Sequence, residues 1–211
     1  MTVGRPVSIP RWQWRTFAGD LSWLAQRLAM PAGSPAHERE EIHLVCVPSA
    51  HHAWLAADVL EMRWRKEVGP TKLELWDTIL QARAPFGATS VARLCSAWGL
   101  PAPESRSEGL EVEELLAKLS AMTPSVRPVK VVRRGRTTDV NGITCCIETI
   151  SAGATLRLDS FAIEHEDPTL LDHLLVELEL DHTVNTSFLA GLKQGLGLGS
   201  NTPKDQQWAK K

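Results

Sequence analysis

The chain opens with a segment in which aromatic and polar residues alternate. Residues 9–17 place Trp12 and Trp14 between Arg11, Gln13 and Arg15. Successive side chains of a β-strand point to opposite faces of the sheet. This segment therefore predicts a strand with one aromatic face and one polar, largely cationic face.

Two later segments, residues 60–66 and 142–149, repeat this two-faced pattern. Their polar faces hold Glu61, Arg63 and Arg65 in the first, and Thr144, Cys146 and Glu148 in the second. If the apolar faces are covered by helices, the polar faces line a closed, hydrated interior. Such an interior favours an anionic guest, because buried arginines are costly without a partner. The alternative is that the polar faces simply point to solvent.

Similar patterns divide the rest of the chain into strands and helices. Further strands are predicted at 40–48, 51–59, 126–134, 136–150 and 154–164, and helices at 20–30, 90–98, 110–122, 168–179 and 186–194; residues 72–79 fit either. The strands form two runs on either side of a helical insertion at about 85–123. We therefore predict a single α+β domain over 1–211, an antiparallel eight-stranded tunnel-like β-barrel decorated by helices.

Composition narrows the possible partners and compartment. The 211 residues carry a formal net charge of −2, which gives the molecule no overall attraction for DNA. No apolar run approaches the roughly 20 residues that span a bilayer, and the N-terminus lacks the apolar core of a secretory signal. The four cysteines have no CxxC spacing. We expect a cytoplasmic protein that binds neither DNA nor membrane.

A basic stretch at residues 126–138 strengthens the expectation of an anionic ligand, because arginine side chains fork onto phosphate oxygens. A solvated basic edge strand is the alternative. The cations expected to hold a phosphorylated small molecule or polyphosphate are Arg11, Arg15, Arg63, Arg65, Lys130, Arg134, Arg136 and Arg157.

Carboxylates on the same strands suggest a divalent metal. Oxygen ligands from Glu61, Glu148, Asp159 and Glu164 would suit Mg²⁺ or Mn²⁺. Asp159 and Glu164 are an odd number of residues apart, so both face inward only if a bulge lies between them.

Three other features carry weaker signals. His51 and His52 are adjacent and would point oppositely on a strand, so a solvated pair is favoured over a metal site. Cys145 and Cys146 favour core packing. The glycine run at 195–199 follows a helix rather than a strand, which argues against a nucleotide-binding turn.

The order of elements and several segments resemble bacterial CYTH-domain proteins. These segments are WQWRTF at 12–17, LEMRWRK at 60–66, FAIEHED at 161–167 and NTSFLAGLKQGLG at 185–197. The superfamily includes class IV adenylyl cyclases, thiamine triphosphatases and inorganic triphosphatases, the triphosphate tunnel metalloenzymes. The nearest resemblance is to a branch labelled CYTH or exopolyphosphatase-like. It implies an eight-stranded antiparallel tunnel in which basic side chains hold a triphosphate and glutamates hold magnesium or manganese.

The chain departs from the family pattern at several of its functional positions. The first-strand ExExK pattern falls on residues 11–15, so Arg11 and Gln13 replace the two acids, while Arg15 keeps the cation. A Lys-x-Arg pattern falls on Trp54 and Ala56. Near the end, an ExE pattern becomes Ala162 and Glu164, whereas Glu61 and Arg63 match an acid and a base.

Three functions follow as hypotheses. One is a metal-dependent phosphohydrolase for a triphosphate or polyphosphate, weakened or altered in specificity by these replacements. The second is a non-catalytic tunnel that binds a nucleotide, another small ligand or a protein. The third is a repurposed tunnel with different chemistry, with Trp54, Cys146 and His52 in its wall.

Overall fold

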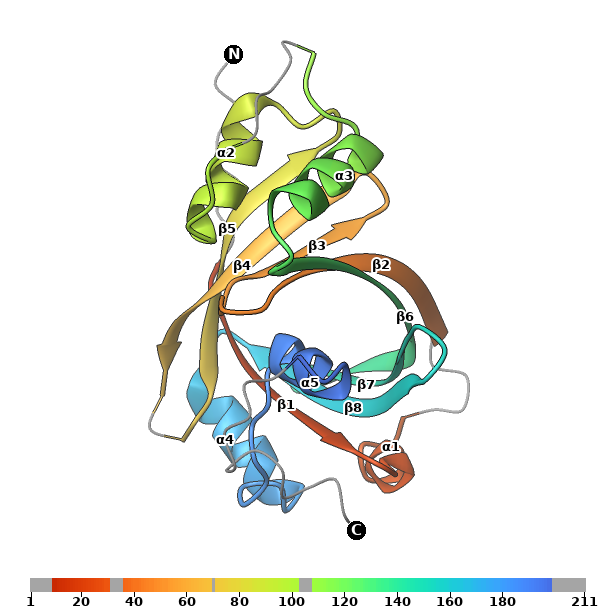
Figure 1. Cartoon of the computed structure of the whole chain (residues 1–211). Helices are drawn as coiled ribbons and strands as arrows, with labels where there is room; N and C mark the ends of the chain where they lie inside the picture. Colours follow the sequence, from red (N-terminus) through yellow and green to blue (C-terminus); the bar gives the residue numbers. More distant parts are fainter. Residues whose placement is uncertain (1–8, 31–35, 70, 103–107, 199–211) are drawn as a thin grey trace.

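Eight antiparallel strands close into a barrel in the computed structural model, which describes residues 9–30, 36–69, 71–102 and 108–198 (Figure 1). Around the barrel the strand order is β1-β5-β4-β3-β2-β6-β7-β8, and β8 pairs with β1 to complete the circle. The strands are β1 (Arg11–Ala18), β2 (Ala36–Cys46), β3 (His52–Ala56), β4 (Val59–Val68), β5 (Glu74–Arg83), β6 (Val126–Val140), β7 (Ile143–Ala152) and β8 (Leu156–His165). The predicted α+β barrel is confirmed.

Four helices cover the outside of the barrel. The outer faces of β3, β4 and β5 pack against two helices in the β5–β6 connection, and the outer faces of β1, β7 and β8 pack on two others. These helices are α2 (Ala88–Ala97), α3 (Val112–Met122), α1 (Ser22–Arg27) and α4 (Pro168–Glu177). The helices explain why the outer side chains of the barrel can be apolar. No helix among the described residues is long and apolar enough to cross a membrane.

The last helix, α5 (Phe188–Gly195), lies at one end of the barrel rather than on its wall (Figure 1). Phe188, Leu189 and Leu192 pack against inward-facing residues of five strands, including Phe17 and Val131. Ser187 caps the helix by accepting a hydrogen bond from the backbone of Ala190. An apolar plug therefore fills this end of the barrel.

The β6–β7 hairpin differs from the sequence prediction, which ended one strand at residue 134 and began the next at 136. The strand instead runs through Gly135, and the turn falls at Asn141 and Gly142, whose φ angles are 54° and 86°. Asn-Gly suits such a turn because both of its central residues need positive φ. Gly135 has a different purpose: a Cβ there would collide with the backbone of Ile147 and with Glu148. The glycine permits a close approach between strands and does not end one.

Candidate functional site

The polar faces of the strands do point into the barrel. Gln13 and Arg15 face inward from β1, whereas Trp14, only 2% exposed, packs outward into the cluster under α1 and α4. On β4, Glu61 and Arg63 face inward while Met62 packs beneath α2 and α3. The predicted alternation is thus correct on both strands, because the outer helices bury the apolar side chains.

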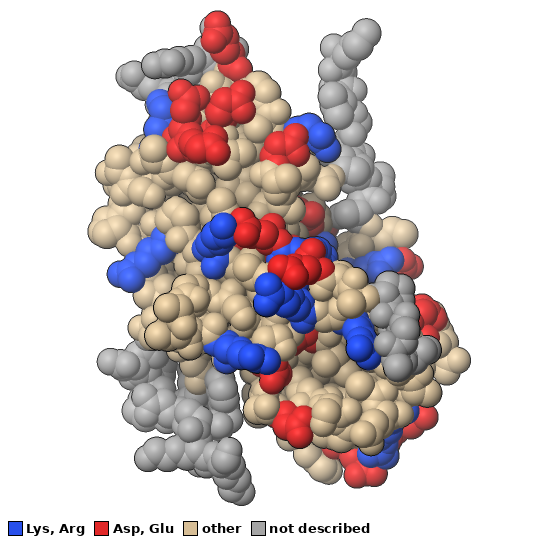
Figure 2. Space-filling model, turned by 90° about the vertical axis from the view of Figure 1, so that its right-hand side faces the viewer, with Lys and Arg blue, Asp and Glu red and all other residues tan. Residues whose placement is uncertain are grey.

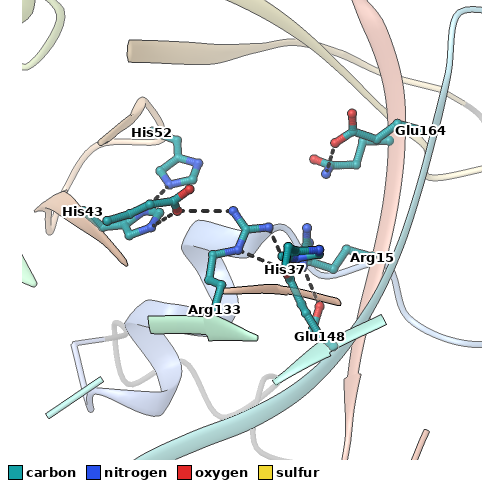
Figure 3. A network of polar contacts seen from close by, with 10 residues as sticks. Arg15, His37, His43, His52, Arg133, Glu148 and Glu164 are labelled. Atoms are coloured by element: carbon teal, nitrogen blue, oxygen red, sulfur yellow. Dashed lines mark hydrogen bonds and ion pairs between the residues drawn. The ribbon is translucent and has the colours of Figure 1, made fainter. Parts of the chain in front are cut away.

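Glu148 of β7 lies at the centre of a buried ion-pair network (Figure 3). Its Oε1 accepts hydrogen bonds from Arg15 Nη1 at 2.7 Å and Arg133 Nη2 at 2.8 Å, and its Oε2 accepts from Arg133 Nε at 2.9 Å. Ser160 Oγ also lies within hydrogen-bond distance of Arg15. Burial alone would raise the pKa of Glu148, but the charges and hydrogen bonds of the two arginines lower it to about 2. The carboxylate is therefore ionised and paired with both arginines.

A chain of hydrogen bonds extends this network along β2 and β3. Arg133 Nη1 lies 3.3 Å from Glu41 Oε2, which is 3.0 Å from His43 Nε2; His43 Nδ1 is in turn 2.9 Å from His52 Nε2. An ionised carboxylate can only accept, so His43 donates from Nε2 and, when neutral, accepts at Nδ1 from His52. Burial, followed by the positive charge of neighbours such as Arg133, holds the pKa of His52 well below its usual value.

Phe188 closes this network from the plugged end. Its ring stacks on His43 at 4.7 Å and His52 at 5.4 Å between centroids. The guanidinium groups of Arg15 and Arg133 lie 5.3 and 4.9 Å from the centre of the same ring. These contacts keep water away from the ion pairs, which strengthens their electrostatic interaction.

A cavity of about 330 Å³ opens at another part of the barrel, among β1, β4, β5 and β8. It is lined by Ile9, Arg11, Gln13, Arg63, Trp76, Thr78, Glu164 and Glu166. Gln13 Nε2 donates to Glu164 Oε1 at 2.8 Å, and Arg63 donates to Glu61 at 2.9 Å while stacking over Trp54. We call this space the mouth cavity.

The four predicted metal ligands do not form one site. Glu148 is held by two arginines, Glu61 by Arg63 and Glu164 by Gln13. Asp159 lies on the outer face of β8, where it accepts from Thr149 at 2.6 Å. The β7–β8 register is regular, so no bulge turns Asp159 inward, and this prediction is wrong. The carboxylates do not fit a shared Mg²⁺ or Mn²⁺ site.

The basic stretch of β6 also needs correction, because its predicted residues face outward. Lys130 pairs with Glu40 at 2.7 Å and Arg134 with Glu38 at 3.0 Å, all with exposed side chains. Arg136 on β6 and Arg157 on β8 are likewise exposed. Cations and acids lie side by side in the middle of the face shown in Figure 2, in keeping with these cross-strand pairs.

Of the remaining predicted cations, Arg15 is buried in the network and Arg11 and Arg63 line the mouth cavity. Arg65 pairs with Glu74 at 2.6 Å. Sequence reasoning missed Arg133, which lies inside the barrel although its neighbour Arg134 lies outside. The alternation with buried Val131 was the signal that could have placed it.

His52 was expected to be solvated and is instead partly buried, with its Nε2 2.9 Å from Nδ1 of buried His43. Glu41, His43 and Phe188 were not singled out at all. Their roles depend on how β2, β3 and α5 meet in space, which no local pattern encodes. Cys145 packs in the outer core as expected, while Cys146 faces the interior between Thr144 and Glu148.

No family model matches the chain, and no curated protein is similar to it. Among solved structures it is similar to a Bacillus halodurans protein described as "a putative adenylate cyclase". The match covers 84% of this chain and 94% of that one, with 10% sequence identity and a TM-score of 0.47.

Proposed function

We propose that the barrel is a binding protein for a small phosphorylated or otherwise anionic molecule, held at the mouth cavity without metal-dependent hydrolysis. The observation that carries the proposal is the state of the interior carboxylates. Each of Glu41, Glu61, Glu74, Glu148 and Glu164 already accepts a hydrogen bond or ion pair from a neighbouring side chain. A hard divalent cation such as Mg²⁺ takes six oxygen ligands, and drawing several of these carboxylates to one ion would break the pairs that hold them, including those of the buried arginines.

The mouth cavity has the size and chemistry for a small anion. Its volume of about 330 Å³ lies at the lower end of the range for small-molecule sites. Arg11 forms no ion pair with another described residue, and Arg63 reaches the same space. Thr78 and Gln13 add hydrogen-bonding groups, and Trp76 adds an aromatic wall. Glu164 and Glu166 limit how much negative charge the cavity can accept.

A weakened phosphohydrolase is the second candidate. It is favoured by the closed antiparallel barrel with Arg15, Arg63 and Arg133 in its interior, which could neutralise phosphate charge. The replacement of the expected first-strand acids by Arg11 and Gln13 weighs against it. Arg11 would repel a cation, and the amide of Gln13 already holds Glu164.

Thermal denaturation at low salt tests the binding proposal. Tripolyphosphate and ATP should each raise the melting temperature, and EDTA should not reduce the rise, because the ligand binds the native cavity and no metal is required. The Arg11→Ala/Arg63→Ala double variant should bind at least about tenfold more weakly, since it loses two charge-assisted contacts. The Lys130→Ala/Arg134→Ala variant, which removes two outer cations, is the matched control and should respond as the unmodified protein does.

Phosphate release separates the two candidates. We expect release from tripolyphosphate at the uncatalysed rate with either Mg²⁺ or Mn²⁺ present. A flat melting curve with every anion would contradict the binding proposal. Rapid metal-dependent release that Glu164→Gln abolishes would instead establish the phosphohydrolase.

A further inference from the structure

Three side chains of different chemical kinds meet inside the barrel, away from the mouth cavity. His37 of β2 and Cys146 and Glu148 of β7 bring one nitrogen, one sulfur and one oxygen atom within 4.8 Å of one another. Cys146 and Glu148 share the inner face of β7 because they are two residues apart. We call these three residues the His-Cys-Glu cluster.

A glycine makes this cluster possible. In the register, His37 lies opposite Gly135 of β6, and Gly135 lies opposite Glu148 of β7. A Cβ at position 135 would collide with Ile147 and Glu148, so any other residue would push β7 away from β6. Without a side chain between them, His37 and Glu148 approach each other across the width of β6 (Figure 3).

Two of the cluster's ligand atoms, His37 Nε2 and Glu148 Oε2, each have a lone pair that could bind a metal. His37 Nε2 is buried, has no hydrogen-bond partner and lies 3.9 Å from Glu148 Oε2. Glu148 Oε1 takes two arginine donors, but Oε2 takes only Arg133 Nε, which leaves it a free lone pair. A separation of 3.9 Å is long for a hydrogen bond. It is close to the roughly 3.4 Å between two ligands of one tetrahedral ion with bonds of about 2.0–2.2 Å.

From this geometry we propose that the His-Cys-Glu cluster binds a borderline divalent transition metal of the Zn²⁺ class. Imidazole nitrogen, thiolate sulfur and carboxylate oxygen are the ligands that Zn²⁺ takes in proteins, whereas Mg²⁺ prefers oxygen alone. Three protein ligands leave a fourth position for water or another small ligand. The His37 side chain is 22% exposed, which gives the ion a route from solvent.

The neighbouring arginines set the strength expected of this site. Arg15 and Arg133 remain close to Glu148, and their positive charge opposes a second cation. Binding also requires the Cys146 thiol to release its proton. We therefore expect weaker binding than in a closed structural site with four ligands. This inference does not depend on anion binding at the mouth cavity.

Cobalt absorption tests the cluster directly, because Co²⁺ substitutes for Zn²⁺ and reports its ligands. Titration of the full, reduced chain with Co²⁺ should produce a thiolate-to-cobalt charge-transfer band that saturates at one equivalent and disappears when Zn²⁺ is added. Excess Mg²⁺ should leave the band unchanged. Cys146→Ser should abolish the band, and His37→Gln should weaken Co²⁺ binding at least about tenfold.

Cys145→Ser is the matched control, since Cys145 is the next residue but faces the outer core. It should keep the band, provided that its circular dichroism matches that of the unmodified chain. A band that survives in Cys146→Ser, or no band in the folded unmodified chain, would overturn the proposal. Cys146→Ser should also keep its response to tripolyphosphate, so failure of the metal site and failure of the anion site can be told apart.

Discussion

Glu148 holds a negative charge at a position where its side chain is completely buried, and two arginines compensate it. The cost of burying these charges is large, so the network does not by itself make the protein more stable than an apolar core would. Once one of these ions is buried, however, each of its partners must be present, because an unpaired buried charge is strongly destabilising. Glu148 therefore balances the charge of Arg15 and Arg133 in the interior.

Glu148→Gln should lower the free energy of unfolding by about 3–5 kcal/mol, because Arg15 and Arg133 would stay buried without their main anion. Urea denaturation monitored by tryptophan fluorescence measures the change. Glu38→Gln is the control, since it breaks an ion pair with Arg134 that is exposed on the outer face. No measurable change is expected there. Equal changes in the free energy of unfolding for the two substitutions would show that the interior ion pairs contribute no more to stability than the exposed pair.

The buried histidines predict a pH-dependent stability. Burial lowers the folded-state pKa of both His43 and His52 below the usual value of 6.5. The unfolded chain then binds more protons than the folded one as the pH falls through 6.5, so stability present above that value is lost below it. A second loss follows as the pH falls from 4.5 to about 2, because Glu41 and Glu148 take up protons near pH 4.5 in the unfolded chain but only near pH 2 in the folded one.

His52→Gln should reduce the first of these losses, because the amide can still donate to His43 but cannot take up a proton. The free energy of unfolding at about pH 7 and about pH 5 should differ less in this variant than in the unmodified protein. His182→Gln, at a ring that is 94% exposed, should leave the difference unchanged. If His52→Gln loses as much stability between about pH 7 and about pH 5 as the unmodified protein, protonation of His52 is not the source of the loss.

At the scale of elements, α5 depends on close approach to the barrel. Gly191 lies against the ring of Phe17 with no room for a Cβ, and Gly195 similarly meets Leu156. Lys193 secures the helix by donating to the backbone oxygens of Val47 and Ser49 at 2.9 and 2.6 Å. Small residues at these positions let the helix enter the barrel end and bring Phe188 to the ion-pair network.

Gly191→Ala should destabilise the protein by about 1–3 kcal/mol through overpacking against Phe17, although alanine is the better helix former. Thermal and urea denaturation provide the measurement. Gly19→Ala is the control, because a Cβ at Gly19 has no neighbour within 4 Å. A stabilised Gly191→Ala variant would mean that α5 is not packed tightly in the barrel end.

At the scale of the whole molecule, the barrel is paired unevenly around its circumference. β6 pairs with β2 from Val126 to Arg136 and with β7 from Val131 to Val140, while β1 meets β5 only at residues 11–13. The short β1–β5 contact is also the side on which the mouth cavity opens. The barrel therefore combines long strand pairings around β6 with a short β1–β5 pairing beside the mouth cavity.

Hydrogen exchange should reflect this difference. Amides in the ladders of β6, β7 and β8 should exchange more slowly than those at the β1–β5 contact, because local opening costs least where few strand bonds must break. Mass spectrometry of peptides from residues 9–13, which contain the β1–β5 contact, and from residues 143–152 gives the comparison. A saturating anion in the mouth cavity should slow exchange in the first peptide more than in the second. Faster exchange in the second peptide would contradict this description of the barrel.

The sequence by itself determined the two-faced strands, the helical connection between β5 and β6, and the α+β barrel. These follow from local physics, since alternation, helical spacing and capping residues act within a few neighbours. It also indicated that Arg15, Arg63 and Glu148 face one interior. The sequence did not identify which alternate residues of β6 face the interior, because a run of basic residues without acids is compatible with either face.

Only the tertiary structure decided which charges cancel and where open space remains. Glu41, Arg133 and Glu148 come from three strands, and their ionisation depends on distances of a few ångströms that the chain order does not encode. The cluster of His37, Cys146 and Glu148 depends on the missing side chain of Gly135 in the strand between them. Strand patterns specify which face a residue occupies, but electrostatic pairing and metal-ligand geometry arise only when the register brings those faces together.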